Sequence, residues 1–422
     1  MDKRVKKIVD QTRLAFELVD YFLHQYSFRR DVTIFNETVY KLSMEWFPNG
    51  YKDYQDDELN PDGTVSIEYN LNTNQFDSVI FVGGLTYAKG PTFPSNDVES
   101  ITTWIEEETG LPFGKQFELL KAEGSEFVFQ ECWKGVLVSP TGRIEVELDE
   151  HSRLIGFSKY GQFPSPDMFM EEDYSLTLPD VKEIAKGQIQ LLDMPLNDQK
   201  RLKRIFALEE IYIRNDKSST IPFEVIVDVR AYTPIEEVLY WETTTDLEVE
   251  RKPIFNREQL TVEQFFSNEP HLDVKPLTKD EIDLCINTVR AFLSSYYEAD
   301  SGRWVLKTLH REQGCINAIV KTVTPTGLVF QRKLLVMIDP VSFEVLNFMD
   351  NEGFLDVWKS YTPSVDGIIT REQAFTEISK TLTLTPTYVY DFAIQQYVLC
   401  GKLDSDYGVD SVTGELIKLD DL

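Results

Sequence analysis

Pairs of short apolar segments joined by a polar turn recur along the chain. In each pair an alternating segment ends in Asp or Asn, Ser or Thr follows three residues later, and a second apolar segment begins. The pattern occurs at residues 67–81, 146–157, 336–348 and 407–419, and a looser copy joins 225–228 to 238–241. Alternation with a period of two is typical of strands, so each pair predicts a β-hairpin.

The turn residues of these hairpins have a structural explanation. They are Asn70 with Thr73, Asp149 with Ser152, Asp339 with Ser342, and Asp410 with Thr413 and Gly414. Asp and Asn oxygens accept hydrogen bonds from backbone N–H groups two or three residues later, Ser and Thr support the same bend, and glycine adopts left-handed backbone angles without strain. We therefore expect these residues to hold turns rather than to act in catalysis.

Helical periodicity precedes most of the hairpins. Capping-box patterns begin at Thr278 and Thr370, ahead of predicted helices over 282–292 and 374–382. Further helices are predicted over 2–26, 98–108 and 181–192. Between helix and hairpin, Pro-Thr-Gly turns at 140–142 and 325–327 separate further strands, over 127–133, 135–138 and 143–146 in one place and over 318–323 and 328–330 in the other.

These elements predict an α+β protein of tandem repeat units, each with one helix packed on a three- to four-stranded antiparallel sheet. The predicted units cover residues 1–92, 93–168, 169–267, 268–362 and 363–422, the last being the shortest. The sequence leaves open whether they form one continuous core or two lobes that divide near Pro270.

The last unit carries a family resemblance. A Thr-Arg-Glu-Gln-Ala-Phe start at 370–375, a short helix and a strand pair ending at 409–417 resemble a PepSY-type repeat. Several such units in tandem resemble the YcdB/YcdC repeat proteins of Gram-positive bacteria, best over 363–422, less well over 278–352 and 93–160, and weakly over 1–92 and 170–265. PepSY-type units occur in propeptides and regulatory segments that restrain peptidases, mostly outside the cytoplasm.

The resemblance supplies no catalytic residues for this chain. The chain also departs from that setting, because its first residues do not form the apolar run of a signal peptide and no protease is attached. An inhibitory role is therefore not carried over, and we expect a cytoplasmic protein.

Charge narrows the choice of partners. The 422 residues include 42 Lys and Arg against 71 Asp and Glu, which gives a formal net charge of −29. Such a surface repels nucleic acid and anionic membranes, and we expect neither as a partner. The simplest reading of the charge is solubility, and attraction of a basic partner is the alternative.

Candidate chemistry is sparse. The four cysteines, Cys132, Cys285, Cys315 and Cys400, have apolar neighbours and predict buried free thiols. The four histidines, His24, His151, His271 and His310, have no zinc-ligand spacing. Residues 58–69 resemble a calcium loop, but Glu58 and Tyr69 replace its first and last ligands, so the segment predicts a turn. We expect no cofactor and no metal.

The sequence therefore favours a non-enzymatic binding or regulatory scaffold that engages a protein or peptide partner through sheet faces or edges. The alternative is an uncharacterised hydrolase with an acidic site between repeat units, which predicts a pocket holding two carboxylates of raised pKa. A purely structural subunit with a large apolar interface is a third possibility. The identity of the ligand and the oligomeric state are left open.

Overall fold

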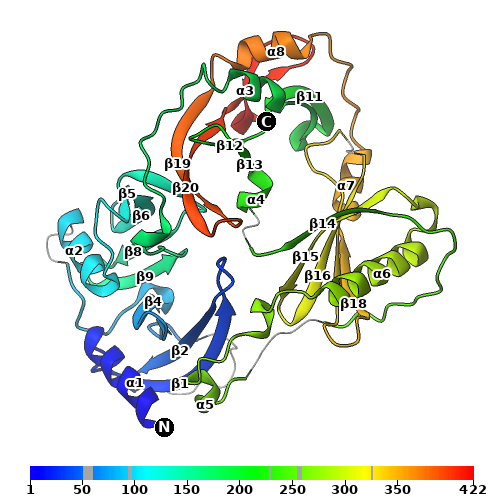
Figure 1. The fold of residues 1–422 in the computed structure, drawn as a ribbon. Coiled ribbons are helices and arrows are strands. Elements are labelled where there is room, and N and C mark those ends of the chain that lie inside the picture. Colours follow the sequence, from blue (N-terminus) through cyan, green and yellow to red (C-terminus); the bar gives the residue numbers. More distant parts are fainter. Residues whose placement is uncertain (51–59, 94–96, 228–229, 254–258, 325–326) are drawn as a thin grey trace. The chain divides into compact units, whose positions relative to one another are not determined.

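The computed structural model of the protein describes residues 1–50, 60–93, 97–227, 230–253, 259–324 and 327–422. Within these ranges the chain is a mixed α+β protein with eight α-helices and several largely antiparallel sheets (Figure 1). It divides into two compact units: unit 1 is Met1–Met170, Arg257–His271 and Thr387–Val398, and unit 2 is Glu171–Asn256, Leu272–Pro386 and Leu399–Leu422. The predicted α+β class is confirmed, whereas the tandem PepSY-like units and their five ranges stay predictions.

Unit 1 is built on one large sheet. Its strands, in spatial order, are β1 (Tyr21–Val32), β2 (Thr38–Pro48), β3 (Val65–Asn70), β4 (Gln75–Phe81), β9 (Leu154–Tyr160), β8 (Arg143–Leu148), β6 (Glu126–Trp133), β7 (Val136–Ser139) and β19 (Thr383–Asp391), with β5 (Phe117–Glu123) also paired to β6. Neighbours are antiparallel except β7 and β19, which pair in parallel through Thr387–Val389.

Three helices of unit 1 share one hydrophobic core with this sheet. They are α1 (Lys3–Ala15), α2 (Val98–Thr109) and α5 (Val262–Phe265), which bury side chains such as Val5, Ile105 and Phe265. Trp104 of α2 packs edge-on against Phe157 of β9. The predicted units 1–92 and 93–168 therefore share a single core, because each half of the sheet supplies strands to it.

Unit 2 contains a four-stranded antiparallel sheet in the order β10 (Ile189–Leu196), β11 (Arg201–Leu208), β21 (Tyr407–Asp410) and β22 (Leu416–Lys418). The helices α3 (Lys182–Gln188) and α8 (Arg371–Ile378) share a core with it. Nearby in the sequence, β12 (Ile211–Arg214) pairs with β13 (Thr220–Pro222) and with β20 (Gln396–Asp404), and α4 (Phe223–Val227) follows β13.

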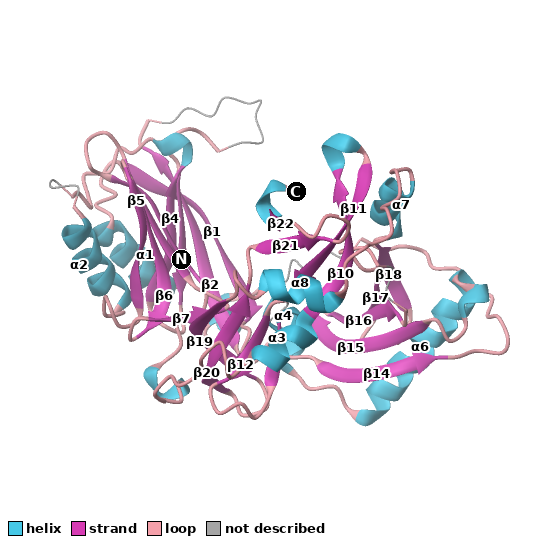
Figure 2. Cartoon of the chain, turned by 90° about the horizontal axis from the view of Figure 1, so that it is seen from above, coloured by secondary structure: helices cyan, strands magenta, loops and turns pink. Residues whose placement is uncertain are grey.

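The second sheet of unit 2 is a five-stranded antiparallel meander of β14 (Thr233–Leu239), β15 (Trp304–Glu312), β16 (Cys315–Thr322), β17 (Lys333–Ile338) and β18 (Val345–Asp350). The long helix α6 (Lys279–Tyr296) runs along one face of it (Figures 1 and 2), and the short helix α7 (Glu352–Lys359) follows β18. This part matches the predicted arrangement of one helix across a meander, but it has five strands and β14 precedes the helix in the chain.

Side-chain alternation gives this sheet two different faces. Ile316, Ala318 and Val320 of β16 join Phe292 and Leu293 of α6 in one buried cluster. Successive residues of a strand point to opposite faces, so Cys315, Asn317, Ile319 and Lys321 lie on the other side. We call this side, opposite α6, the second face.

Local sequence signals were reliable where the chemistry was local. The capping boxes at Thr278 and Thr370 are confirmed. Each threonine hydroxyl accepts a hydrogen bond from the backbone N–H of the third residue of its helix, and the side chain of that residue accepts one from the backbone N–H of the threonine. Asp97 caps α2, and Gly110 ends it in the left-handed conformation. The four hairpin pairs are confirmed as antiparallel strand pairs. The four cysteines are buried and free, as predicted.

The N-terminal helix prediction over 2–26 is wrong in its second half. Helix α1 ends at Ala15, Glu17 has a positive φ of 45°, and β1 begins at Tyr21. A bulge between Leu23 and Gln25 shifts the register of β1 against β2. The bulge interrupts the alternation that identifies a strand, and the remaining apolar spacing imitates a helix.

Other corrections concern short segments. The helix predicted over 181–192 stops at Gln188, and the rest of it is the start of β10. Val225 lies in α4 rather than in a strand, and 328–330 contains only an isolated bridge from Leu328 to Asp193. The looser hairpin copy is therefore wrong, although Asp228 itself lies outside the described residues. Glu58 of the calcium-like segment and Pro325 and Thr326 of the second Pro-Thr-Gly turn also lie outside them.

The Asp or Asn of each hairpin turn accepts two backbone hydrogen bonds on one side-chain oxygen. Asn70 Oδ1 accepts from the N–H groups of Asn72 and Thr73, Asp149 Oδ1 from His151 and Arg153, Asp339 Oδ1 from Val341 and Ser342, and Asp410 Oδ1 from Val412 and Thr413. These bonds lower the pKa of Asp339 below its usual value, because they favour the charged carboxylate.

The Asp339 turn tests the structural role of these acids. We expect Asp339→Ala to lower the free energy of unfolding by about 1–2 kcal/mol, because two backbone donors lose their acceptor. Asp339→Asn keeps an oxygen at the same position and should retain most of that stability. Urea denaturation of the two variants and the parent chain measures both effects. Equal losses in the two variants would show that the negative charge matters and the turn hydrogen bonds do not.

Candidate functional site

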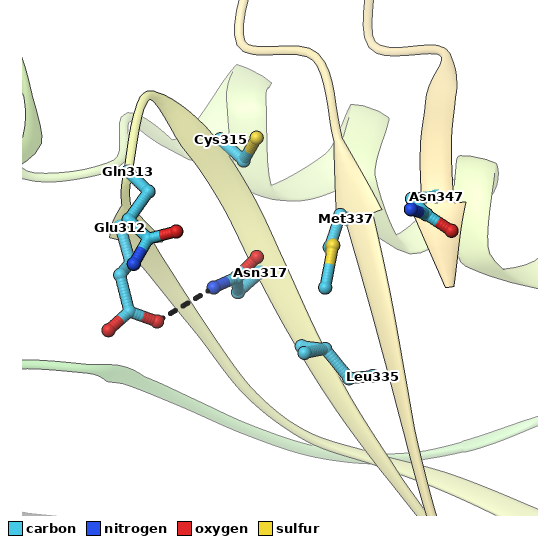
Figure 3. A pocket seen from close by; sticks show the side chains of 7 residues that line it. All are labelled: Glu312, Gln313, Cys315, Asn317, Leu335, Met337 and Asn347. Carbon is cyan, nitrogen blue, oxygen red and sulfur yellow. Dashed lines mark hydrogen bonds between the residues drawn. The ribbon is translucent and has the colours of Figure 1, made fainter. Parts of the chain in front are cut away.

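Two cavities lie on the second face of the five-stranded sheet. The smaller, of about 360 Å³, is lined by Glu312, Gln313, Cys315, Asn317, Leu335, Met337 and Asn347 (Figure 3). The larger, of about 560 Å³, is lined by residues of α4, β14, β15 and β16 together with Pro222, Arg230, Tyr232 and Lys333. The sizes are typical of ligand-binding pockets.

The cavities follow each other along β16. Cys315 and Asn317 line the smaller one, and the next two residues on the same face, Ile319 and Lys321, line the larger one. Strand β17 repeats the arrangement, with Leu335 at the smaller cavity and Lys333 at the larger. At roughly 3.3 Å per residue, the six steps from Cys315 to Lys321 span about 20 Å. The two cavities therefore lie in line along one face of the sheet, and we call this row the β16 track.

A polar cluster lies where the two cavities adjoin. It consists of Arg230, His310, Glu312 and Asn317, and we call it the His310 cluster. Arg230 Nη1 lies 2.6 Å from Glu312 Oε2 and 3.0 Å from His310 Nε2. Asn317 Nδ2 donates to the same Glu312 oxygen over 3.0 Å (Figure 3). His310 of β15 and Asn317 of β16 stand directly opposite each other in the strand register, which brings the cluster together.

The short contact from Arg230 decides the tautomer of His310. A guanidinium group can only donate, so His310 Nε2 at 3.0 Å from Nη1 accepts the hydrogen bond. The proton of the neutral ring therefore resides on Nδ1. The His310 Nε2 contact to Glu312 Oε2 is longer, at 3.5 Å, and is a hydrogen bond only when the ring is charged and Nε2 carries a proton.

Two buried polar atoms of the cluster have no hydrogen-bond partner among the described residues. They are Nδ1 of His310 and Oδ1 of Asn317, whose side chains are 5% and 6% exposed. Leaving such groups unpaired costs about 1–3 kcal/mol each, and native proteins do so rarely. With the tautomer above, the pair offers one N–H donor and one oxygen acceptor. Both atoms are buried, so a ligand in either cavity does not touch them in this conformation.

The larger cavity is more positive than the chain as a whole. Its lining holds four cationic side chains, Arg230, Lys307, Lys321 and Lys333, against two carboxylates, Glu224 and Glu236. Lys307 pairs with Glu236 at 2.6 Å and Lys321 with Glu224 at 2.8 Å. Arg230 pairs with Glu312 at 2.6 Å, so three of the four cations have a carboxylate partner.

The acid of the cluster is held in its charged form. Its neighbours His310 and Arg230 lower the pKa of Glu312 to about 2. A general acid working near neutral pH needs the opposite shift. Glu312 therefore acts as a fixed negative charge that orients Arg230 and Asn317.

The sequence-predicted turn residues lie away from this site. Asp339 and Ser342 follow β17 on the same sheet but line neither cavity, and Asp410, Thr413 and Gly414 form the β21–β22 turn. Asn70, Thr73, Asp149 and Ser152 belong to unit 1. Among the histidines, His24 stacks on Phe47 and His151 is exposed, whereas His271 and His310 are buried.

Sequence reasoning missed the His310 cluster. The sequence pattern shows only that His310 lacks zinc-ligand spacing, and it does not single out Arg230, Glu312 or Asn317. One signal was available: His310 and Glu312 occupy alternate positions at the end of a strand, and Asn317 interrupts the apolar run from Cys315 to Val320. Polar residues on one face of an otherwise apolar strand pair indicate a special environment.

Two absences are limited to the described part of the chain. There, no group of three or more His, Cys, Asp or Glu side chains is placed to hold a metal ion. Over the same ranges, no helix is long and apolar enough to cross a membrane.

Comparison with known proteins adds little. No protein-family model matches the chain, and no curated protein does either. A solved structure, the C-terminal domain of YpeB from Bacillus megaterium, is similar at 11% sequence identity, covering 83% of this chain and 97% of that one, with a TM-score of 0.25. A likeness at that TM-score carries no argument, so the resemblance to the YcdB/YcdC repeat family stays a prediction.

Unit 1 contains a second unusual group, the buried carboxyl of Glu131 on β6. The residue is 2% exposed, its Oε2 accepts from the Gly142 N–H over 2.8 Å, and its Oε1 has no partner among the described residues. Burial raises the pKa of Glu131 from 4.5 to about 8, since one hydrogen bond does not replace the lost hydration of the charge. Glu131 lines neither of the two cavities described above.

This pKa shift predicts a pH-dependent stability. Between pH 4.5 and about 8 the folded chain keeps a proton on Glu131 that the unfolded chain releases, so stability falls as the pH rises through this range. Glu131→Gln lacks the titration and should be more stable than the parent by about 3 kcal/mol at pH 7, but not at pH 4. Urea denaturation at both pH values measures the difference. Glu126→Gln on the same strand, where the side chain is exposed, is the control. A gain that is equal at both pH values would contradict the assignment.

Proposed function

We propose that this chain is a non-enzymatic binding protein whose β16 track takes an extended segment of a protein partner. The observation that carries the proposal is the pair of cavities that follow each other along β16 on the second face. An extended peptide of about six residues matches a track of about 20 Å.

The edges of the same sheet are less suited to a partner than its second face. At β18, the backbone N–H of Lys252 donates to Leu346 O, and Asn347 Nδ2 donates to Lys252 O, so this edge is already bonded. At β14, a bulge lies between Pro234 and Glu237, and Glu236 has a positive φ of 54°. Bulges, proline and charged residues are the features by which proteins prevent another strand from pairing with an exposed edge. They support binding on the face rather than by strand addition.

The charge state of the acids supports binding over hydrolysis. A hydrolase that works with two carboxylates near neutral pH needs one of them protonated, with a raised pKa. Glu312, the acid of the His310 cluster, has a lowered pKa instead. Among the described residues, the carboxyls with a raised pKa are Glu131 and Glu108, and both belong to unit 1, whereas the track belongs to unit 2. A regulatory role and a cytoplasmic location remain predictions from the sequence.

A displayed library of random linear heptapeptides, selected against the full chain, tests the proposal. We expect enriched peptides whose binding is weakened at least about tenfold in Kd by Leu335→Lys, equivalent to about 1.4 kcal/mol. Leu335 lies half-buried at the smaller cavity, so a lysine there places charge and bulk in the track. Isothermal titration calorimetry of synthetic copies of the enriched peptides measures the change.

Leu191→Lys is the matched control, since Leu191 is an exposed strand residue of the same unit on β10. It should leave the affinity unchanged. Unfolding curves of both variants establish that each is folded. The proposal is overturned if no peptide is enriched, or if enriched peptides bind the Leu335→Lys chain as tightly as the parent.

A further inference from the structure

We infer that the larger cavity of the β16 track takes an aromatic side chain of the partner segment. The peptide part of this statement rests on the function proposed above, whereas the aromatic site stands on the cavity itself. The net charge of the chain gives no indication of such a ligand, because an aromatic side chain is neutral.

The first argument is the apolar wall of the cavity. The helix α4 and the strands β14 and β16 contribute to this wall from different sides. The apolar residues that line the cavity are Pro222, Phe223, Val225, Tyr232, Pro234 and Ile319. Ligand pockets are typically lined in this way, and aromatic pairs gain free energy beyond the burial of their area. The rings of Phe223 and Tyr232 therefore favour an aromatic ligand over an aliphatic one.

The second argument is the pairing of the charged residues at the same cavity. Carboxylates pair with three of its four cations, and the fourth, Lys333, has an interaction of its own. A charged ligand would have to displace a partner that is already in place, whereas a neutral side chain leaves every pair intact. Glu224 and Glu236 have side chains that are 67% and 57% exposed, so their ion pairs lie at the mouth of the cavity. Contacts of this kind around a binding pocket help to exclude water from its centre.

The third argument is the exposure of the apolar lining. Phe223 is 42% exposed, whereas Ile319, which lines the same cavity from the sheet, is 9% exposed. A ring that enters the volume of about 560 Å³ would cover Phe223 and contact Ile319. Aromatic side chains seated in such pockets supply much of the affinity of protein interfaces.

The smaller cavity sets the spacing to a second side chain of the segment. Leu335 and Met337 give it an apolar lining, and Leu335 stands directly opposite Ile319 in the strand register. Along β16, the first lining residue of the larger cavity, Ile319, follows that of the smaller one, Cys315, by four positions. Four residues of extended chain span roughly 13 Å, and side chains four apart point to the same side. We therefore expect an aromatic residue and an aliphatic residue four positions apart.

Methyl NMR of the full chain tests the aromatic site directly. The reporter is the Cδ1 methyl group of Ile319, whose signal is assigned by its loss in Ile319→Val. The probes are N-acetyltryptophan amide, N-acetylleucine amide and N-acetylglutamine amide. We expect the tryptophan probe to shift the signal saturably, because a ring current acts on a methyl group that the ring contacts. The leucine probe should bind at least about threefold more weakly. The glutamine probe should leave the signal unchanged.

Salt separates a neutral ligand from a charged one. The Kd of the tryptophan probe should change by less than about twofold between roughly 50 and 500 mM NaCl, because screening acts on charges.

A cavity-filling variant gives a second readout. Thr308 of β15 is half-buried and lines the same cavity. Thr308→Trp places a ring in the cavity and should weaken the tryptophan probe about tenfold or more. Thr308→Ser leaves the cavity open and should change the Kd by less than about twofold. Unfolding curves of both variants establish that each is folded.

A variant of the exposed wall does not depend on overpacking the sheet. Phe223→Ala removes one aromatic ring and should weaken the tryptophan probe at least about threefold. Phe354→Ala is the matched control, because Phe354 is a 76% exposed residue of α7 that lines neither cavity. Binding that neither Thr308→Trp nor Phe223→Ala weakens would overturn the inference.

The outcomes separate the two proposals. If library peptides bind the track without enrichment of Trp, Tyr or Phe, and the tryptophan probe does not move Ile319, the aromatic inference fails and the peptide-binding function stands. If the tryptophan probe binds but no peptide does, the function fails and the aromatic site stands. Equal shifts from the glutamine probe, or binding that weakens strongly with added salt, would also overturn the aromatic inference.

Discussion

The packing of α6 against one face of the five-stranded sheet is the constraint on which the candidate site depends. Because side chains alternate along each strand, residues that join α6 in its core leave their neighbours on the second face. A single helix covers one side of a sheet. The second face then carries Cys315, Asn317, Ile319 and Lys321 of β16 in a row, and both cavities follow that row.

Turn and cap chemistry made much of the local structure predictable. Thr278 and Thr370 mark helix starts because a hydroxyl and a reciprocal side chain satisfy backbone groups within four residues. Asp339 and Asp410 mark hairpins for a similar reason. The helix prediction over 2–26 was wrong at β1 for an equally local reason. The bulge after Leu23 removes the strict alternation of apolar and polar residues by which a strand is predicted. The grouping of strands into units depends on contacts between distant segments, which no local pattern contains.

The His310 cluster could not be assembled from the sequence. His310 and Asn317 meet because the β15–β16 register places them opposite each other, and a register slip of one residue would move them to different faces. Arg230 precedes both by a long stretch of chain and reaches His310 only in the folded unit. Net charge was also a poor guide, because a total of −29 says nothing about how four cations gather at one cavity.

The C-terminal hairpin of β19 and β20 has a consequence for how the chain folds as it is made. Thr387–Val398 belong to unit 1, whereas the residues on either side belong to unit 2. Strand β7 obtains its parallel neighbour from Thr387–Val389, which the ribosome adds long after the rest of that sheet. One edge of β7 is therefore unpaired during synthesis until these residues are added. An unpaired strand edge is prone to pair with other chains. A nascent chain that stalls before residue 387 would present that edge for as long as the stall lasts.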